Sequence, residues 1–125
     1  MHMMTRLTAS LALLFVLAAV GADRALAVDA KEVFTFYCAQ CHGLEGNGDG
    51  PNVTADFPVT PRKFSNADEM NKLTDADIRN AILDGGPAVS KSAMMPPWSK
   101  TLTDEEVEAL VSYLRELCAC EGKAE

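Results

Sequence analysis

The sequence has 125 residues, with 18 Asp or Glu against 11 Lys or Arg and a formal net charge of −7 at pH 7. A chain of this length forms one small domain. Its negative charge argues against nucleic acid or an anionic membrane surface as a partner, because both would repel it.

The N-terminal segment has the pattern of a secretory signal peptide. Arg6 precedes an apolar run of 12 residues at 11–22, and Ala25-Leu26-Ala27 matches the small-x-small pattern of a cleavage site. A membrane-spanning helix needs about 20 apolar residues. We therefore expect cleavage after Ala27 rather than retention of the segment as a membrane anchor.

The predicted organisation is a signal peptide at 1–27 and one domain at 28–125, exported to the periplasm and without a membrane span after cleavage. This domain carries nine Lys or Arg and 17 Asp or Glu, which gives a net charge of −8. Its acidic residues are densest at 104–108 and 116–125. Such runs are typical of a solvated helix face and tail, and they would also steer the protein toward a partner with a basic docking surface.

The first predicted helix covers residues 29–42. Apolar positions recur in it at steps of three and four, which is the spacing of one helix face. They are Val33, Phe34, Tyr37, Cys38 and Cys41. The helix ends in Cys38-Ala39-Gln40-Cys41-His42, and C-x-x-C-H is the spacing that attaches a c-type haem.

The residue types of this motif fit haem chemistry. Two cysteines three positions apart lie on nearly the same side of a helical turn, so both sulfurs can add to the two vinyl groups along one haem edge. His42 then supplies an imidazole nitrogen to the iron. The alternatives are a structural disulfide, a thioredoxin-like pair, which should lie in a βαβ pattern, and a zinc site, which needs four ligands. We expect one haem c, bound covalently through Cys38 and Cys41.

The rest of the chain predicts a loop and two well-capped helices. Residues 43–62 contain four glycines and three prolines, too many breakers for regular structure, and residues 65–70 can form one helical turn. Capping-box patterns start helices at Thr74 and Thr103. The first of these helices runs to about residue 84, where Gly85-Gly86-Pro87 ends it. No strand pattern occurs, so the predicted fold class is all-α.

The second iron ligand decides between two kinds of haem protein, since an iron with one protein ligand binds gases or peroxide and an iron with two passes electrons. His42 is the only histidine after the predicted cleavage site, which makes a methionine thioether the natural candidate. Met94 and Met95 precede Pro96-Pro97, and these prolines stiffen the backbone of their loop. We favour Met95 and interpret Met70 as core filler.

The domain as a whole resembles the class I cytochromes c. The matching segments are C-A-Q-C-H-G at 38–43, G-N-G-D-G-P at 46–51, P-R-K-F at 61–64, I-L-D-G-G at 82–86, M-P-P-W at 95–98 and the last predicted helix at 102–115. The resemblance implies three to five helices around one haem, with the first and last helices crossing where Phe34 meets Tyr113. It also implies that Met95 is the axial ligand, with Met94 as its competitor.

Three further site residues follow from the resemblance alone. It implies that the carbonyl of Pro51 accepts a hydrogen bond from the ring of His42, which would fix the tautomer of the ligand. It also implies that Arg62 lies near a haem propionate and that Trp98 lies against the methionine side of the haem.

These features predict a carrier that moves single electrons between redox partner proteins, and not an enzyme. If Met95 is a labile ligand, the same fold becomes a peroxidase-like enzyme or a gas-binding sensor. A third alternative is an electron-transfer subunit of a larger periplasmic oxidoreductase.

Cys118 and Cys120 depart from the pattern of the family. Thiols rarely stay free in an oxidising compartment, yet residues two apart on a helix point to different sides, so a bond between them requires local unwinding. We favour a structural disulfide, while a cross-link to a second chain and a copper or zinc site stay open.

Overall fold

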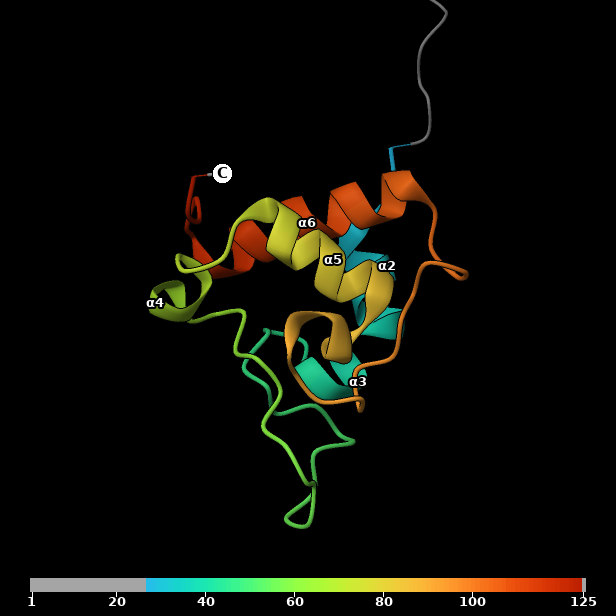
Figure 1. Cartoon of the computed structure of the whole chain (residues 1–125), viewed down its shortest axis with the longest axis vertical. Coiled ribbons are helices and arrows are strands. Elements are labelled where there is room, and N and C mark those ends of the chain that lie inside the picture. The colour runs from blue at the N-terminus through green and yellow to red at the C-terminus, as the bar shows by residue number, and fades with distance from the viewer. Residues whose placement is uncertain (1–26, 125) are drawn as a thin grey trace, which may run out of the picture.

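The computed structural model describes residues 27–124 (Figure 1). Its α-helices are α2 (Ala30–Tyr37), α3 (Ala39–His42), α4 (Ala67–Met70), α5 (Asp75–Asp84) and α6 (Asp104–Cys118), and a 3-10 helix, η2 (Gly86–Val89), follows α5. This part of the chain contains no strand, so the all-α prediction is confirmed. Nearly all of the predicted signal peptide at 1–27 lies outside the described residues, and cleavage after Ala27 stays a prediction.

The first predicted helix is divided in two at Cys38, where the sequence favoured one helix over residues 29–42. Cys38 has φ −110° and ψ −37°, well away from the usual helical φ of about −63°. Its own N–H still donates to the carbonyl of Phe34 at 2.8 Å, and its carbonyl accepts from His42 at 3.0 Å. The chain therefore re-enters a helix after one distorted residue, and both motif cysteines stay within one turn of each other.

Both predicted capping boxes are present. At the start of α5, the backbone N–H of Asp77 donates to the Thr74 hydroxyl at 3.0 Å, and the Thr74 N–H donates to the Asp77 carboxylate at 2.9 Å. Thr103 and Glu106 make the same pair of bonds at the start of α6, at 3.2 and 2.8 Å. A side-chain cap is worth about 1 kcal/mol, so each helix has a well-defined first residue.

The core forms where α2 and α5 pack against α6 (Figure 1). Phe34 of α2 is 1% exposed and lies between two aromatic rings, with its centroid 5.3 Å from that of Tyr113 and 6.1 Å from that of Phe64. The predicted crossing of the first and last helices through Phe34 and Tyr113 is thus confirmed. The other buried members are Ala39, Met70, Ile78, Ile82, Leu102, Val107, Leu110, Val111, Leu114 and Cys118.

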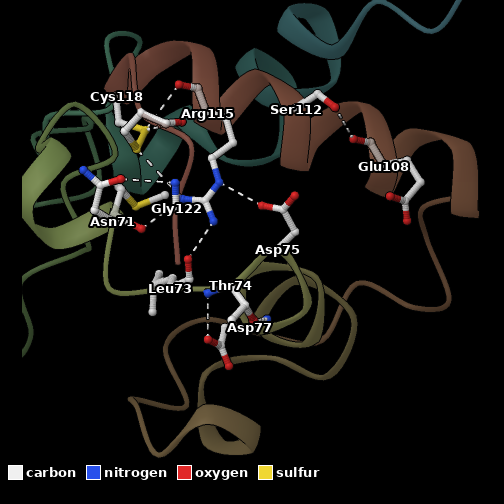
Figure 2. A network of polar contacts seen from close by, with 12 residues as sticks. Asn71, Leu73, Thr74, Asp75, Asp77, Glu108, Ser112, Arg115, Cys118 and Gly122 are labelled. Atoms are coloured by element: carbon white, nitrogen blue, oxygen red, sulfur yellow. Dashed lines mark hydrogen bonds and ion pairs between the residues drawn. A yellow bond between two sulfur atoms is a disulfide. The ribbon is translucent and has the colours of Figure 1, made fainter. Parts of the chain in front are cut away.

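The end of the chain folds back on the connection between α4 and α5. Cys118 and Cys120 form a disulfide, and Ala119 between them has φ +47°. The backbone N–H of Gly122 then donates to the Asn71 side chain at 3.1 Å (Figure 2). The backbone N–H of Lys123 donates to the Leu73 carbonyl at 2.9 Å. Of the alternatives for these cysteines, the structure contains the intrachain bond. We call residues 118–123 the C-terminal hook.

Among residues 27–124, no helix combines the length and the apolar character that a membrane crossing requires.

Candidate functional site

A cavity of about 890 Å³ opens between the helices. Ligand pockets in proteins are typically about 300–1,000 Å³ and mainly apolar, with a few placed polar groups. Every helix of the described part contributes to its lining, and the loops at 57–64 and 88–98 complete it. The lining includes all three motif residues and both candidate methionines: Cys38, Cys41, His42, Met94 and Met95.

The motif cysteines lie half-buried in the cavity wall as free thiols. Burial, together with the neighbouring Cys41, raises the pKa of Cys38 to about 12. Cys38 is therefore a neutral S–H group at pH 7. A thiol that adds to a vinyl group becomes a thioether, which has no charge to bury, so an apolar wall suits the product as well.

The ring of His42 is held on two sides. Its Nδ1 lies 3.0 Å from the carbonyl oxygen of Arg62, and its plane stacks on Phe64 with 4.3 Å between the centroids. A carbonyl only accepts, so Nδ1 must donate and the neutral ring keeps its lone pair on Nε2. Burial also lowers the pKa of His42, which favours this neutral form. The arrangement is the one found at metal-binding histidines, where the second ring nitrogen donates to an acceptor.

The hydrogen bond to His42 was predicted at the carbonyl of Pro51, and that prediction is wrong for this structure. The neighbours of Pro51 are tied to the backbone of α3: Gly50 donates to the carbonyl of Cys41 at 3.2 Å and Asn52 donates to that of Gln40 at 2.8 Å. These bonds hold Pro51 at an exposed position at the end of the helix. The chain returns to the His42 ring eleven residues later, at Arg62.

The side chain of Arg62 lines the cavity, as expected, but it also has a protein partner. Its Nη1 lies 3.8 Å from the Glu69 carboxylate, and about a third of the side chain is exposed. A pair of this kind is weak in solvent, so the guanidinium stays available to another anion. Lys63 and Lys91 also line the cavity, which makes its polar border more basic than the chain as a whole.

The two candidate methionines differ in burial. Met94 is 50% exposed, whereas Met95 is half-buried and packs against the core. Trp98, the remaining predicted site residue, also lines the cavity, and its ring meets that of Tyr37 edge to face at 5.3 Å. The structure therefore brings Met95 and Trp98 to the same cavity as the C-x-x-C-H motif.

Two side chains contribute to the site in ways that the sequence analysis did not predict. Phe64 was part of a matching segment, but its stacking on His42 depends on a turn that brings residues 61–64 back to α3. Met70 was interpreted as core filler, and it is indeed fully buried, yet it also lines the cavity. No sequence signal indicated the stacking of Phe64, because nothing in the sequence marked Arg62 as the acceptor for His42.

Comparison with known proteins agrees with this geometry. The family described as cytochrome c matches residues 27–117. The chain is 31% identical over 94 residues to cytochrome c6 of Bryopsis maxima, covering 75% of this chain and 91% of that protein.

Solved structures give the same picture. The KustC0563 c-type cytochrome superposes with a TM-score of 0.56 at 34% identity, over 72% of this chain and 98% of that one. A chain of the Kuenenia stuttgartiensis reducing HAO-like protein complex Kustc0457/Kustc0458 gives a TM-score of 0.57 at 25% identity. That match covers 77% of this chain and 49% of the other.

The fold and the site define a class I c-type cytochrome. The chain belongs to the cytochrome c family. As a member it is an electron-transfer protein, and the family implies covalently bound haem c. The residues present fit that group, because an apolar cavity with two free thiols and an imidazole presenting Nε2 offers the attachment and ligation that a haem c requires.

Proposed function

We propose that this protein is a periplasmic carrier of single electrons that holds one haem c through Cys38 and Cys41, with His42 and Met95 as iron ligands. The haem, when bound, supplies an iron that alternates between the ferric and ferrous states. The observation that carries the proposal is the meeting of all four side chains in one cavity, with Nδ1 of His42 already bonded to a backbone carbonyl.

The role of His42 follows from its two contacts. The Arg62 carbonyl fixes the tautomer, and Phe64 fixes the plane of the ring. A donated hydrogen bond at Nδ1 also makes Nε2 more basic and so strengthens it as a ligand. These contacts keep the ligand in place in both redox states, which limits the structural change that each electron transfer requires.

The role of Met95 follows from ligand chemistry and burial. A thioether opposite histidine raises the reduction potential. Of the two methionines in the loop, Met95 is the more buried, and an exposed sulfur would have to leave solvent to reach the cavity. The rings of Tyr37 and Trp98 pack edge to face in the cavity wall that this loop completes.

The negative surface supports a partner with a basic docking surface. Asp104, Glu105 and Glu108 on α6 and Glu116 near its end are all exposed. Charge of one sign speeds association with an oppositely charged partner, and the effect falls as salt is added. Export is supported by the signal-peptide pattern at 1–27, and fractionation of cells that express the full chain tests it.

A second candidate is an electron-transfer subunit of a larger periplasmic oxidoreductase. It is favoured by the similarity to one chain of the reducing HAO-like protein complex. The match covers about half of that chain. Gel filtration of the protein isolated from cells that express it at its natural level separates the two candidates. A carrier elutes at the size of one small domain, whereas a subunit elutes with its complex.

The direct test of the proposal is the optical spectrum of the ferric holoprotein with and without cyanide. A six-coordinate low-spin spectrum, with the charge-transfer band of a methionine–iron bond and slow cyanide binding, is expected. A high-spin spectrum at neutral pH, or immediate cyanide binding, would contradict the carrier and favour a peroxidase-like enzyme or a gas sensor.

A further inference from the structure

We propose that Gly85 and Gly86 are positioning residues for Met95: they let the loop at 86–99 close against the end of α5 and so fix where the Met95 sulfur enters the cavity. The inference rests on the proposed ligation by Met95. It adds a role that the Gly85-Gly86-Pro87 sequence did not indicate, since there the two glycines were read only as a helix stop.

The far end of the loop is bonded to carbonyls of α5. The last four carbonyls of a helix have no partner inside it. In α5, two carbonyls near this end, those of Ile82 and Leu83, accept from the backbone N–H groups of Trp98 at 3.0 Å and Ser99 at 3.2 Å. The loop is thus the C-terminal cap of α5, and its far end moves with that helix.

The near end of the loop is bonded to Met95 itself. The N–H of Gly86 donates to the Met95 carbonyl at 2.9 Å, and the carbonyl of Gly86 accepts from Lys91 at 2.8 Å. The backbone at Met95 is therefore fixed directly to the residue that follows Gly85. The Met94 N–H instead donates within the loop, to the Ser92 hydroxyl at 3.2 Å.

The closeness of these segments leaves no room for a side chain at either glycine. A Cβ on Gly85 would lie 2.8 Å from the Met95 carbonyl oxygen and 2.9 Å from the Pro97 nitrogen, and Gly85 also has φ +79°. A Cβ on Gly86 would overlap the carbonyl oxygen of Ser92. All of these neighbours are backbone atoms, so a methyl group at Gly85 must push residues 95–97 away from the end of α5. A methyl group at Gly86 must push Ser92 away from the start of the loop and so change the path that leads to Met95.

The two glycines test the packing of the same loop at two different contacts. Alanine at Gly85 meets the loop and also an unfavourable φ. Gly86 has no such φ, so alanine there acts through the loop contact alone. Gly86→Ala is therefore the primary variant, and Gly85→Ala is the second variant if the first does not fold. Thr103→Ala is the matched control, because it removes the cap of α6 and lowers stability without touching the loop.

The measurements are the methionine–iron charge-transfer band, the reduction potential and the apparent affinity of the ferric holoproteins for imidazole. Imidazole competes with Met95, so its apparent affinity follows the fraction of molecules in which the sulfur is displaced. Gly86→Ala should weaken the band, lower the potential and raise the imidazole affinity by about tenfold or more. Thr103→Ala should melt earlier with all three properties unchanged.

Three results would overturn the inference, and they can be distinguished from one another. If the wild-type protein has the band and Gly86→Ala and Gly85→Ala keep it with unchanged potential and imidazole affinity, the glycines do not position the ligand, although the proposed ligation stands. If the wild-type protein lacks the band, the ligation by methionine fails, and the inference fails with it. A change of equal size in Thr103→Ala would assign the effect to general loss of stability and also reject the inference.

Discussion

The guanidinium of Arg115 donates from Nη1 to the carbonyl oxygen of Met70 at 2.9 Å, and thereby links the last helix to a fully buried residue of the cavity wall. The same side chain donates from Nη2 to the Leu73 carbonyl and from Nε to the Asp75 carboxylate, both at 2.8 Å (Figure 2). One cation thus holds the connection between α4 and α5 at three points.

Replacement of Arg115 should therefore destabilise the fold strongly. The side chain is 12% exposed, and hydrogen bonds to charged groups contribute about 1.5–3 kcal/mol each, not additively. We expect Arg115→Ala to lower the free energy of unfolding by about 2–4 kcal/mol, and Arg115→Lys to restore little, because an ammonium group lacks the fork that reaches three acceptors. Denaturant titration of the holoproteins measures both.

The matched control is Arg79, which pairs with Glu108 between α5 and α6 but is more exposed. Exposed ion pairs contribute about 0–1 kcal/mol. Arg79→Ala should therefore lower the free energy of unfolding by no more than about 1 kcal/mol. Equal losses of unfolding free energy in Arg79→Ala and Arg115→Ala would show that the buried contacts of Arg115 add no stability beyond that of an exposed ion pair.

The disulfide should stabilise the C-terminal hook more than the whole fold. A bond that closes so short a loop constrains the unfolded chain by only about 1–2 kcal/mol, so Cys118→Ser with Cys120→Ser should unfold slightly earlier. The hook amides of Gly122 and Lys123, which donate to Asn71 and Leu73, should however lose most of their protection from hydrogen exchange.

Thiol alkylation followed by mass spectrometry provides the check on that bond. Without reductant, the denatured wild-type holoprotein should take up no alkylating label at Cys118 or Cys120, and with reductant it should take up two. Hook amides that stay protected in the double variant would show that the hydrogen bonds hold the hook without the disulfide.

The capping box of α5 predicts a pH dependence of stability. The backbone N–H of Thr74 donates to the carboxylate of Asp77 and lowers its pKa below the ordinary value of 3.8. A carboxylate with a depressed pKa in the folded state adds stability above its unfolded pKa and loses it as the pH falls through the folded pKa. The contribution should therefore be complete above about pH 4 and vanish in stronger acid.

Asp77→Asn isolates this contribution, because the amide keeps an acceptor oxygen but does not titrate. The difference in unfolding free energy between the wild type and Asp77→Asn should be largest above about pH 4 and should shrink at lower pH. Parallel pH profiles for the two holoproteins would mean that the charge of Asp77 does not contribute.

The stacking of Phe64 on the His42 ring can be tested by substitution, with Pro51→Ala as the control. Pro51 is exposed and does not accept the hydrogen bond of the His42 ring in the structure, so Pro51→Ala should leave the spectrum and the reduction potential of the holoprotein unchanged. Phe64→Leu removes the stacking on His42 and a buried ring, and should cost about 1–2 kcal/mol of stability and shift the potential. An unchanged reduction potential in Phe64→Leu would show that the stacking on His42 does not affect the iron ligand.

Local sequence signals predicted the features that depend on neighbouring residues. The boxes at Thr74 and Thr103 and the stop at Gly85 each act within a few residues, and all three are present in the structure. The C-x-x-C-H motif is equally local. The contact of Phe34 with Tyr113, which the resemblance to the class I cytochromes c implied, is also present.

The parts that the sequence did not predict depend on long-range contacts of the backbone. Any residue has a carbonyl, so nothing in the side chains marked Arg62 rather than Pro51 as the acceptor for His42. The distortion of the helix at Cys38 likewise could not be predicted, because the helical spacing of apolar residues continues through it. For the hook, Cys118 and Cys120 indicated a disulfide. The sequence did not indicate that the hook also bonds to the carbonyl of Leu73, which lies some fifty residues earlier in the chain.

The central claim is that Met95, and not Met94, completes the iron site with His42. The most direct measurement compares the charge-transfer band and the reduction potential of three ferric holoproteins: the wild type, Met95→Ala and Met94→Ala. The account predicts that Met95→Ala loses the band and falls in potential, because a thioether opposite histidine raises the potential, and that Met94→Ala keeps both. Loss of the band in Met94→Ala with a normal spectrum in Met95→Ala would contradict it.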